Sequence, residues 1–126
     1  MDKFVKRALV IDDEALSREC LREMLELDGF EVCEAENGAS GLQLFRDSAF
    51  DVVITDVIMP VKEGIETIRD ILAVNPAANV IAISGGGRVS ADGFLNTALT
   101  FGAKHVLAKP ISIAEARQAV LNLTGP

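Results

Sequence analysis

The sequence predicts an α/β fold in which helices cover both faces of a five-stranded parallel sheet. Five short apolar runs, rich in Val and Ile, alternate with five segments whose apolar residues recur at helical spacing. The connections are short, and strict alternation with short loops favours parallel strands joined by crossover helices. The 126 residues suit a single domain, because a second domain would lack enough chain for its own core.

The strands are predicted where short β-branched runs or alternating patterns occur. Residues 51–55 read D-V-V-I-T, which is typical of a central strand with both faces covered. Residues 30–35 alternate less regularly and suit the edge of the sheet. The predicted strands are residues 7–11, 30–35, 51–55, 80–83 and 105–108.

The helices are predicted from apolar stripes and from the residues that begin and end them. Asn37-Gly38 is a turn pair before the second helix, and Ser112 with Glu115 forms a capping box at the start of the last. Other helices are predicted over residues 14–27, 64–74 and 91–100. The first helix carries a stripe that we expect to be buried: Leu16, Cys20, Leu21, Met24 and Leu25.

Composition and charge exclude several classes of function. The net charge of −7 argues against direct nucleic-acid binding, which needs Lys and Arg to replace counterions along the phosphates. No apolar run approaches the roughly 20 residues of a membrane helix, and none near the N-terminus is long enough for a signal peptide. We therefore expect a cytoplasmic protein without membrane insertion. Cys20 and Cys33 lack metal-type spacing and are expected to be buried free thiols.

Residues that carry chemistry stand at the ends of four predicted strands. They are Asp12 and Asp13 after the first strand, Asp56 after the third, Ser84 after the fourth and Lys109 after the fifth. In a parallel sheet these positions share one edge, where ligands bind in folds of this class. Three neighbouring carboxylates need a proton or a cation among them, and Mg²⁺ suits such oxygen ligands. A carboxylate can attack phosphorus, while an ammonium and a hydroxyl offset the developing charge.

Each of these residues also has a plain structural interpretation. Asp13 could cap the first helix, Ser84 could simply begin a glycine-rich turn, and Lys109 could be a solvated surface residue. The glycine triplet at residues 85–87 matches neither of the common nucleotide-binding motifs. Because all four strand ends supply a suitable group, the combination favours a phosphoryl-transfer site.

The same residues resemble the receiver domains of two-component response regulators, over essentially the whole chain. The resemblance implies a flavodoxin-like (βα)5 doubly wound sheet with strand order 2-1-3-4-5. It also implies a phosphoacceptor switch rather than an enzyme, with no effector domain in residues 1–126. The motifs that carry it are Asp12-Asp13, the segment T-D-V-I-M-P-V-K-E-G at residues 55–64, Ser84 and the pair Lys109-Pro110, whose bond is expected to be cis.

The resemblance further implies how the site works. Asp56 would accept a phosphoryl group from a histidine kinase or a histidine phosphotransfer protein. Lys109 would pair with that group, Ser84 would move toward it, and the output would pass to a protein partner. Mg²⁺ would be held by Asp13, Asp56 and the backbone carbonyl of Ile58, with Asp12 acting through water.

Three features depart from the family pattern. Val106 stands where an aromatic residue is usual, so signalling through a swinging ring is not expected. The stretch between Ser84 and Lys109 is longer than usual, which predicts a mobile loop around residues 85–88. Ile58 is apolar where fast-hydrolysing members carry a polar side chain, which suggests slow loss of phosphate.

Two other functions are open to this sequence. One is an interaction module that works independently of phosphorylation. The other is a Mg²⁺-dependent phosphatase with an Asp nucleophile, although the D-x-D pattern of such enzymes would require an Asp where Ile58 stands.

Overall fold

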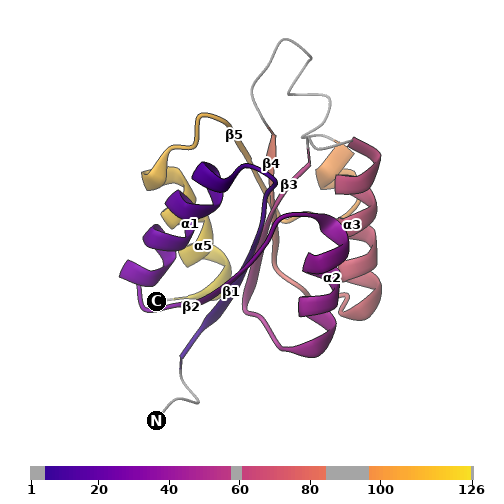
Figure 1. The fold of residues 1–126 in the computed structure, drawn as a ribbon, viewed down its shortest axis with the longest axis horizontal. Helices are drawn as coiled ribbons and strands as arrows, with labels where there is room; N and C mark the ends of the chain where they lie inside the picture. Colours follow the sequence, from indigo (N-terminus) through magenta and orange to yellow (C-terminus); the bar gives the residue numbers. More distant parts are fainter. Residues whose placement is uncertain (1–4, 58–60, 85–96, 126) are drawn as a thin grey trace.

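The fold is a five-stranded parallel sheet with helices on both faces (Figure 1). It is seen in a computed structural model that describes residues 5–57, 61–84 and 97–125. The strand order is β2-β1-β3-β4-β5, which confirms the predicted topology. The elements are β1 (Arg7–Ile11), α1 (Ala15–Leu27), β2 (Glu31–Ala35), α2 (Gly38–Asp47), β3 (Val52–Asp56), α3 (Val61–Val74), β4 (Val80–Ser84), β5 (His105–Ala108) and α5 (Ile113–Thr124).

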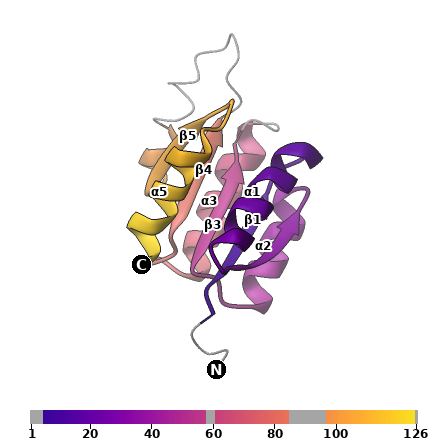
Figure 2. The ribbon, with the colours of Figure 1, turned by 90° about the vertical axis from the view of Figure 1, so that its left-hand side faces the viewer.

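The helices form two layers that enclose the sheet. Helices α1 and α5 cover one face, and α2 and α3 cover the other (Figures 1 and 2). Every residue of β3 and β4 is buried, whereas β2 is mostly half-buried at the edge of the sheet. This difference matches the sequence, because only strands covered on both faces can be apolar throughout.

Two helix starts differ in detail from their predictions. Asn37 does not form a turn pair with its neighbour but is the N-cap of α2, where its Oδ1 accepts a hydrogen bond from Ser40 N at 2.8 Å. Helix α3 begins at Val61, three residues before the predicted start. Ser112 caps α5 as predicted, its Oγ accepting a hydrogen bond from Glu115 N at 3.2 Å.

The predicted apolar stripe of α1 is only partly buried. Leu21, Met24 and Leu25 pack into the core, but Leu16 is 71% exposed and Cys20 is also exposed. The expectation of two buried thiols is therefore wrong for Cys20, while Cys33 is half-buried in β2. Val106, in place of an aromatic residue, is half-buried in β5 and packs against the core.

Part of the predicted fourth helix lies outside the described residues. Residues 97–100 are helical, and the chain turns at Gly102, whose φ of 114° favours glycine. Residues 91–96 and the loop around 85–88 are not described, so those predictions stay predictions. The Lys109-Pro110 bond is cis, as expected. Within the described ranges, no helix is both long and apolar enough to cross a membrane.

The two ends of the described chain meet at the amino edge of the sheet, where the strands begin. Lys6 precedes β1, and its Nζ donates a hydrogen bond to the carbonyl oxygen of Gly125 at 2.8 Å. This contact lies at the amino edge of the sheet, opposite the edge at which the strands end (Figure 1).

Candidate functional site

The register of the parallel strands brings the predicted site residues to one edge. Ile11 pairs with Thr55 on β3, so Asp12, which follows β1, lies at the same height as Asp56, the last residue of β3. On the other side of β3, Asp56 pairs with Ile83 of β4. The adjoining pair, Ser84 with Ala108, places Lys109 directly beyond β5, where its backbone N donates to Ser84 O at 2.8 Å.

Three carboxylates cluster at this edge. Oxygen atoms of Asp12, Asp13 and Asp56 all lie within 4.8 Å of one another. Asp12 and Asp56 are buried and Asp13 is exposed. Burial, and to a smaller extent the charge of Asp56, raises the pKa of Asp12 to about 6 against a partly compensating hydrogen bond from Glu14 N. Such a cluster favours a bound cation, because the charges repel one another in a poorly solvated place.

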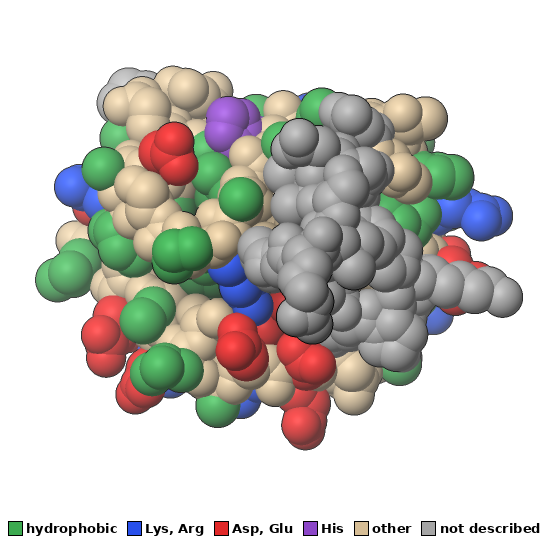
Figure 3. All heavy atoms as spheres, turned by 90° about the horizontal axis from the view of Figure 1, so that it is seen from above, with side chains coloured by type: hydrophobic (Ala, Val, Ile, Leu, Met, Phe, Trp, Pro, Cys, Tyr) green, Lys and Arg blue, Asp and Glu red, His purple; other side chains and the backbone are tan. Residues whose placement is uncertain are grey.

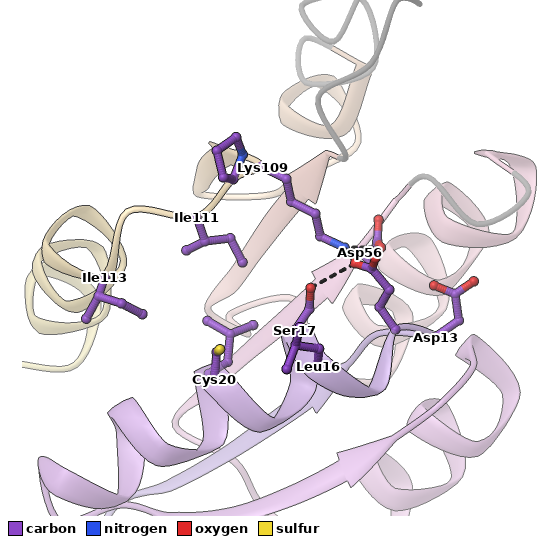
Figure 4. Close-up of a pocket in the computed structure, with 11 residues that line it drawn as sticks. Asp13, Leu16, Ser17, Cys20, Asp56, Lys109, Ile111 and Ile113 are labelled. Carbon is purple, nitrogen blue, oxygen red and sulfur yellow. Dashed lines mark hydrogen bonds and ion pairs between the residues drawn. The ribbon is translucent and has the colours of Figure 1, made fainter.

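Lys109 is the cation that the chain itself supplies. Its Nζ lies 3.2 Å from Asp12 Oδ2, 3.1 Å from Asp56 Oδ2 and 2.8 Å from Glu14 Oε1. Burial disfavours the charged ammonium, but the hydrogen bond to Glu14 and the two Asp carboxylates outweigh it and hold the pKa of Lys109 above its ordinary value. Figure 4 shows the Lys109 side chain extending toward Asp56.

Two buried oxygen atoms at this edge are unsatisfied. Asp12 Oδ2 and Ser84 Oγ make no hydrogen bond to any residue that the structure describes, although Asp12 Oδ2 remains within ion-pair distance of Lys109. Buried polar atoms without partners are rare and call for a ligand, an ion or water. The hard oxygen donors of the triad fit a divalent cation such as Mg²⁺. Ile58, the predicted fourth ligand, lies outside the described residues.

The capping interpretation of Asp13 does not hold in this structure. The N-cap of α1 is Glu14, and no side chain caps it. Asp12, not Asp13, turns its Oδ1 toward the helix start and accepts a hydrogen bond from Glu14 N at 2.9 Å. The Asp13 carboxylate thus remains with the acidic triad.

A groove leads from this site along α1. We call it the α1 groove; it has a volume of about 830 Å³ and runs between α1 and the segment joining β5 to α5. Asp56 and Lys109 line one end, and Leu16, Cys20 and Ile113 line the other (Figure 4). The face on which the strands end shows the same contrast, with acidic side chains beside a basic one and hydrophobic side chains next to them (Figure 3).

Sequence reasoning missed two residues of the site. Glu14 was expected only to begin a helix, yet it makes the shortest contact to Lys109. Its position directly after Asp12-Asp13 was the available signal. Arg18 anchors the same turn, because it donates to Asp12 O at 2.8 Å and to Glu34 Oε1 at 3.2 Å; nothing in its surroundings in the sequence marked it.

Comparison with known proteins agrees with this geometry. The response regulator receiver domain family matches residues 8–121. The chemotaxis protein CheY of Bacillus subtilis (strain 168) is 32% identical over 115 residues, which cover 90% of this chain and 93% of that protein. A response regulator receiver domain protein from Clostridium thermocellum superposes with a TM-score of 0.85 at 33% identity, covering 95% of this chain and 94% of that one.

A third similar protein has been solved in a phosphorylated form. It is a response regulator protein from Burkholderia pseudomallei with a phosphorylated aspartic acid, a calcium ion and citrate. The TM-score is 0.79 at 26% identity, over 91% of this chain and 66% of that one. With its fold, its acidic triad typical of a receiver metal site and these matches, the chain belongs to the response regulator receiver domains of two-component signalling, phosphoacceptors rather than classical enzymes.

Proposed function

We propose that Asp56 accepts a phosphoryl group from the phosphohistidine of a histidine kinase or a histidine phosphotransfer protein, in a reaction that requires Mg²⁺. The observation that carries the proposal is the pairing of a buried carboxylate, Asp56, with an ammonium 3.1 Å away, inside an acidic triad. The unsatisfied hydroxyl of Ser84 adds a donor at the same edge. The phosphorylated aspartic acid and calcium ion of the Burkholderia pseudomallei protein support the same chemistry.

Transfer would proceed by attack of the Asp56 carboxylate on phosphorus. The bond from phosphorus to the donor's imidazole nitrogen breaks as the Asp56 O–P bond forms, and the imidazole leaves neutral after taking up a proton. Lys109 would pair with a phosphoryl oxygen, and Ser84 would donate a hydrogen bond to another. Asp13, Asp56 and the Ile58 carbonyl would hold Mg²⁺, with Asp12 acting through water, and the ion would supply positive charge that offsets the charge of the carboxylate and phosphoryl oxygens.

The α1 groove supports a protein as the donor. Leu16 and Ile113 line the same groove as Asp56 and are 71% and 44% exposed, and exposed apolar side chains in a groove that reaches a reactive group favour contact with another protein. We propose that residues 1–126 act as one domain in the cytoplasm. Its output would pass to a protein partner, either as a conformational switch or as a phosphorelay carrier.

The first test is the intact mass after incubation with acetyl phosphate, with and without Mg²⁺. The parent protein is expected to gain about 80 Da, one phosphoryl group, only with Mg²⁺, whereas Asp56→Asn gains nothing. Asp70→Asn is the matched control, because it removes an exposed carboxylate from α3 and should react like the parent. A gain that persists in Asp56→Asn would contradict the assignment of the acceptor.

Other outcomes favour the other functions. No gain from acetyl phosphate or from a panel of phosphorylated histidine kinases would favour the phosphorylation-independent module. Continuous turnover of small phosphate esters would favour the phosphatase. The slow loss of phosphate expected from Ile58 would be contradicted by a half-life of less than a few seconds at neutral pH.

A further inference from the structure

The Lys109 ammonium has one more carboxylate partner than phosphoryl transfer requires. Asp12 and Asp56 belong to the acidic triad, but Glu14 does not. Even so, the contact to Glu14 is the shortest of the three, at 2.8 Å against 3.2 and 3.1 Å. The carboxylate outside the triad therefore holds the ammonium most closely.

Glu14 is fixed in place by contacts on both its main chain and its side chain. Its backbone N donates to Asp12 Oδ1 at 2.9 Å, which ties the start of α1 to the triad. Its Oε1 accepts a hydrogen bond from Ser17 Oγ at 2.9 Å as well as one from Lys109. The carboxylate is thus aimed at the ammonium by the first turn of the helix.

The partners of Lys109 differ in how easily they can give it up. The side chains of Asp12 and Asp56 are almost fully buried, whereas that of Glu14 is 63% exposed. An exposed carboxylate that loses its partner is solvated at once, so its ion pair contributes little net free energy. A buried carboxylate that loses its partner stays desolvated without compensation, which destabilises the protein. When a phosphoryl group arrives, Glu14 is the partner that can release the ammonium most easily.

Building on the proposed function, we propose that Glu14 is a positioning residue that holds the Lys109 ammonium at the mouth of the unphosphorylated site and competes with the phosphoryl group for it. Glu14 thereby sets how readily Asp56 is occupied. Removing its contact frees one donor of the ammonium for the phosphoryl oxygens.

The test measures the affinity for beryllofluoride, a non-covalent phosphoryl mimic, in the presence of Mg²⁺. Because the chain holds no Trp or Tyr, ¹⁹F NMR is the suitable readout. We expect Glu14→Gln to bind beryllofluoride about two- to fivefold more tightly than the parent, the range that an exposed ion pair can supply. Glu19→Gln is the matched control, since it removes the same charge from an exposed position of α1 and should bind like the parent.

A second variant separates the contact from the charge. Glu14→Asp keeps the negative charge but is one methylene too short for the contact, so it should also bind more tightly. Parent-like affinity in Glu14→Asp would assign the effect to charge alone and overturn the positioning role. Unchanged or weaker binding of beryllofluoride in Glu14→Gln would overturn it as well. Circular dichroism spectra verify that both variants are folded.

The proposed function can fail separately in the same experiment. If the parent shows no Mg²⁺-dependent binding of beryllofluoride, the proposed function fails and this inference falls with it. If the parent binds and Glu14→Gln equals Glu19→Gln, only the role of Glu14 is overturned.

Discussion

At the scale of single residues, the negative charge of Asp12 lowers the stability of the metal-free folded protein. Its side chain is buried, and one of its oxygens makes no hydrogen bond within the described part of the chain. Its pKa is raised from 3.8 to about 6, chiefly by burial. Since the Asp12 carboxyl is protonated and neutral in both the folded and the unfolded chain at low pH, the cost appears only as the pH rises from the unfolded pKa through the folded one.

Asp12→Asn should therefore stabilise the metal-free protein at neutral pH. We expect a gain of about 1–2 kcal/mol at about pH 7.5 and no gain below about pH 4. Urea unfolding in the presence of EDTA, followed by far-UV circular dichroism, measures both values. The control is Asp13→Asn, whose exposed carboxylate should change the free energy of unfolding by less than about 0.5 kcal/mol. A loss of stability in Asp12→Asn at neutral pH would contradict the prediction.

The sequence marked the site residues at the strand ends better than it marked Glu14. Asp12, Asp56 and Ser84 could be predicted because parallel strands bring their ends together whatever the side chains do. The contact of Glu14 with Lys109 could not, because it depends on the rotamer of an exposed side chain and on a hydrogen bond from Ser17.

At the scale of elements, Gly64 sets how closely α3 approaches the chain beyond β3. A Cβ at this position would lie 2.6 Å from Val57 Cα and 3.0 Å from Val57 C and O, which are all backbone atoms. Val57 follows Asp56 directly, and its N donates to Ile83 O at 2.8 Å. The missing side chain therefore lets α3 pack against the residue that follows Asp56.

Gly64→Ala should lower the free energy of unfolding by about 1–3 kcal/mol, because backbone atoms must shift to admit the methyl group. Gly41→Ala in α2 is the comparison for side-chain crowding, since the three atoms nearest its Cβ would all belong to the buried side chain of Ile11, with Cγ1 at 2.7 Å, and none to the backbone. Ala has a better helix propensity than Gly, which offsets part of the crowding. The free energy of unfolding should therefore fall less in Gly41→Ala than in Gly64→Ala. Equal stability of Gly64→Ala and the parent in urea unfolding would contradict the close approach.

The apolar stripe of α1 shows why periodicity misplaces some residues. Hydrophobic spacing predicts which side of a helix faces the protein, but not how far the neighbouring elements extend along it. Leu21, Met24 and Leu25 lie over the sheet and α5, whereas Leu16 and Cys20 line the α1 groove instead of packing into the core. Such residues combine an apolar pattern with exposure, which is typical of a binding surface.

Leu16→Asp should slow phosphotransfer from a phosphorylated histidine protein by about tenfold while leaving phosphorylation by acetyl phosphate unchanged. The small donor needs only the site, but the protein donor must also cover the groove. Leu27→Asp is the control: Leu27 is 87% exposed at the far end of the same helix, away from the groove. Equal slowing of both donors would show that Leu16 supports the site and not a protein contact.

At the scale of the whole molecule, we expect the acidic site to couple cation binding to folding. The net charge is −7, and three carboxylates of that excess lie within 4.8 Å of one another. A cation that binds only the folded arrangement must stabilise it. Mg²⁺ at 100 times its dissociation constant should add about 2.7 kcal/mol to the free energy of unfolding.

Thermal unfolding with and without Mg²⁺ tests this coupling. The melting temperature of the parent should rise, and the rise should be smaller in Asp13→Asn and Asp56→Asn because each removes a carboxylate that we propose holds the ion. NaCl at equal ionic strength is the control, since it screens charge without binding the triad. A rise of the same size in NaCl would mean that the cations act by screening alone.

The parallel α/β class could be predicted because several independent patterns agreed, whereas the strand order followed from the family resemblance. Five apolar runs separated by helical stripes leave few arrangements other than a parallel sheet, and the site then follows from the sheet. Element ends were less certain. Helix α3 begins at Val61, three residues before the predicted start at Gly64. The start was missed because residues 61–63 carry no apolar pattern strong enough to mark it.

The hydrogen bond between Lys6 and Gly125 has a practical consequence for anyone who attaches this protein to something else. Both residues sit at the amino edge of the sheet, while Asp56 sits at the carboxyl edge. A fluorophore, a bead or a fused reporter joined next to either residue would lie at the amino edge and leave the edge that carries Asp56 open. A short linker joining Lys6 to Gly125 would likewise allow a circular permutation, with new termini placed in another loop and the sheet undisturbed.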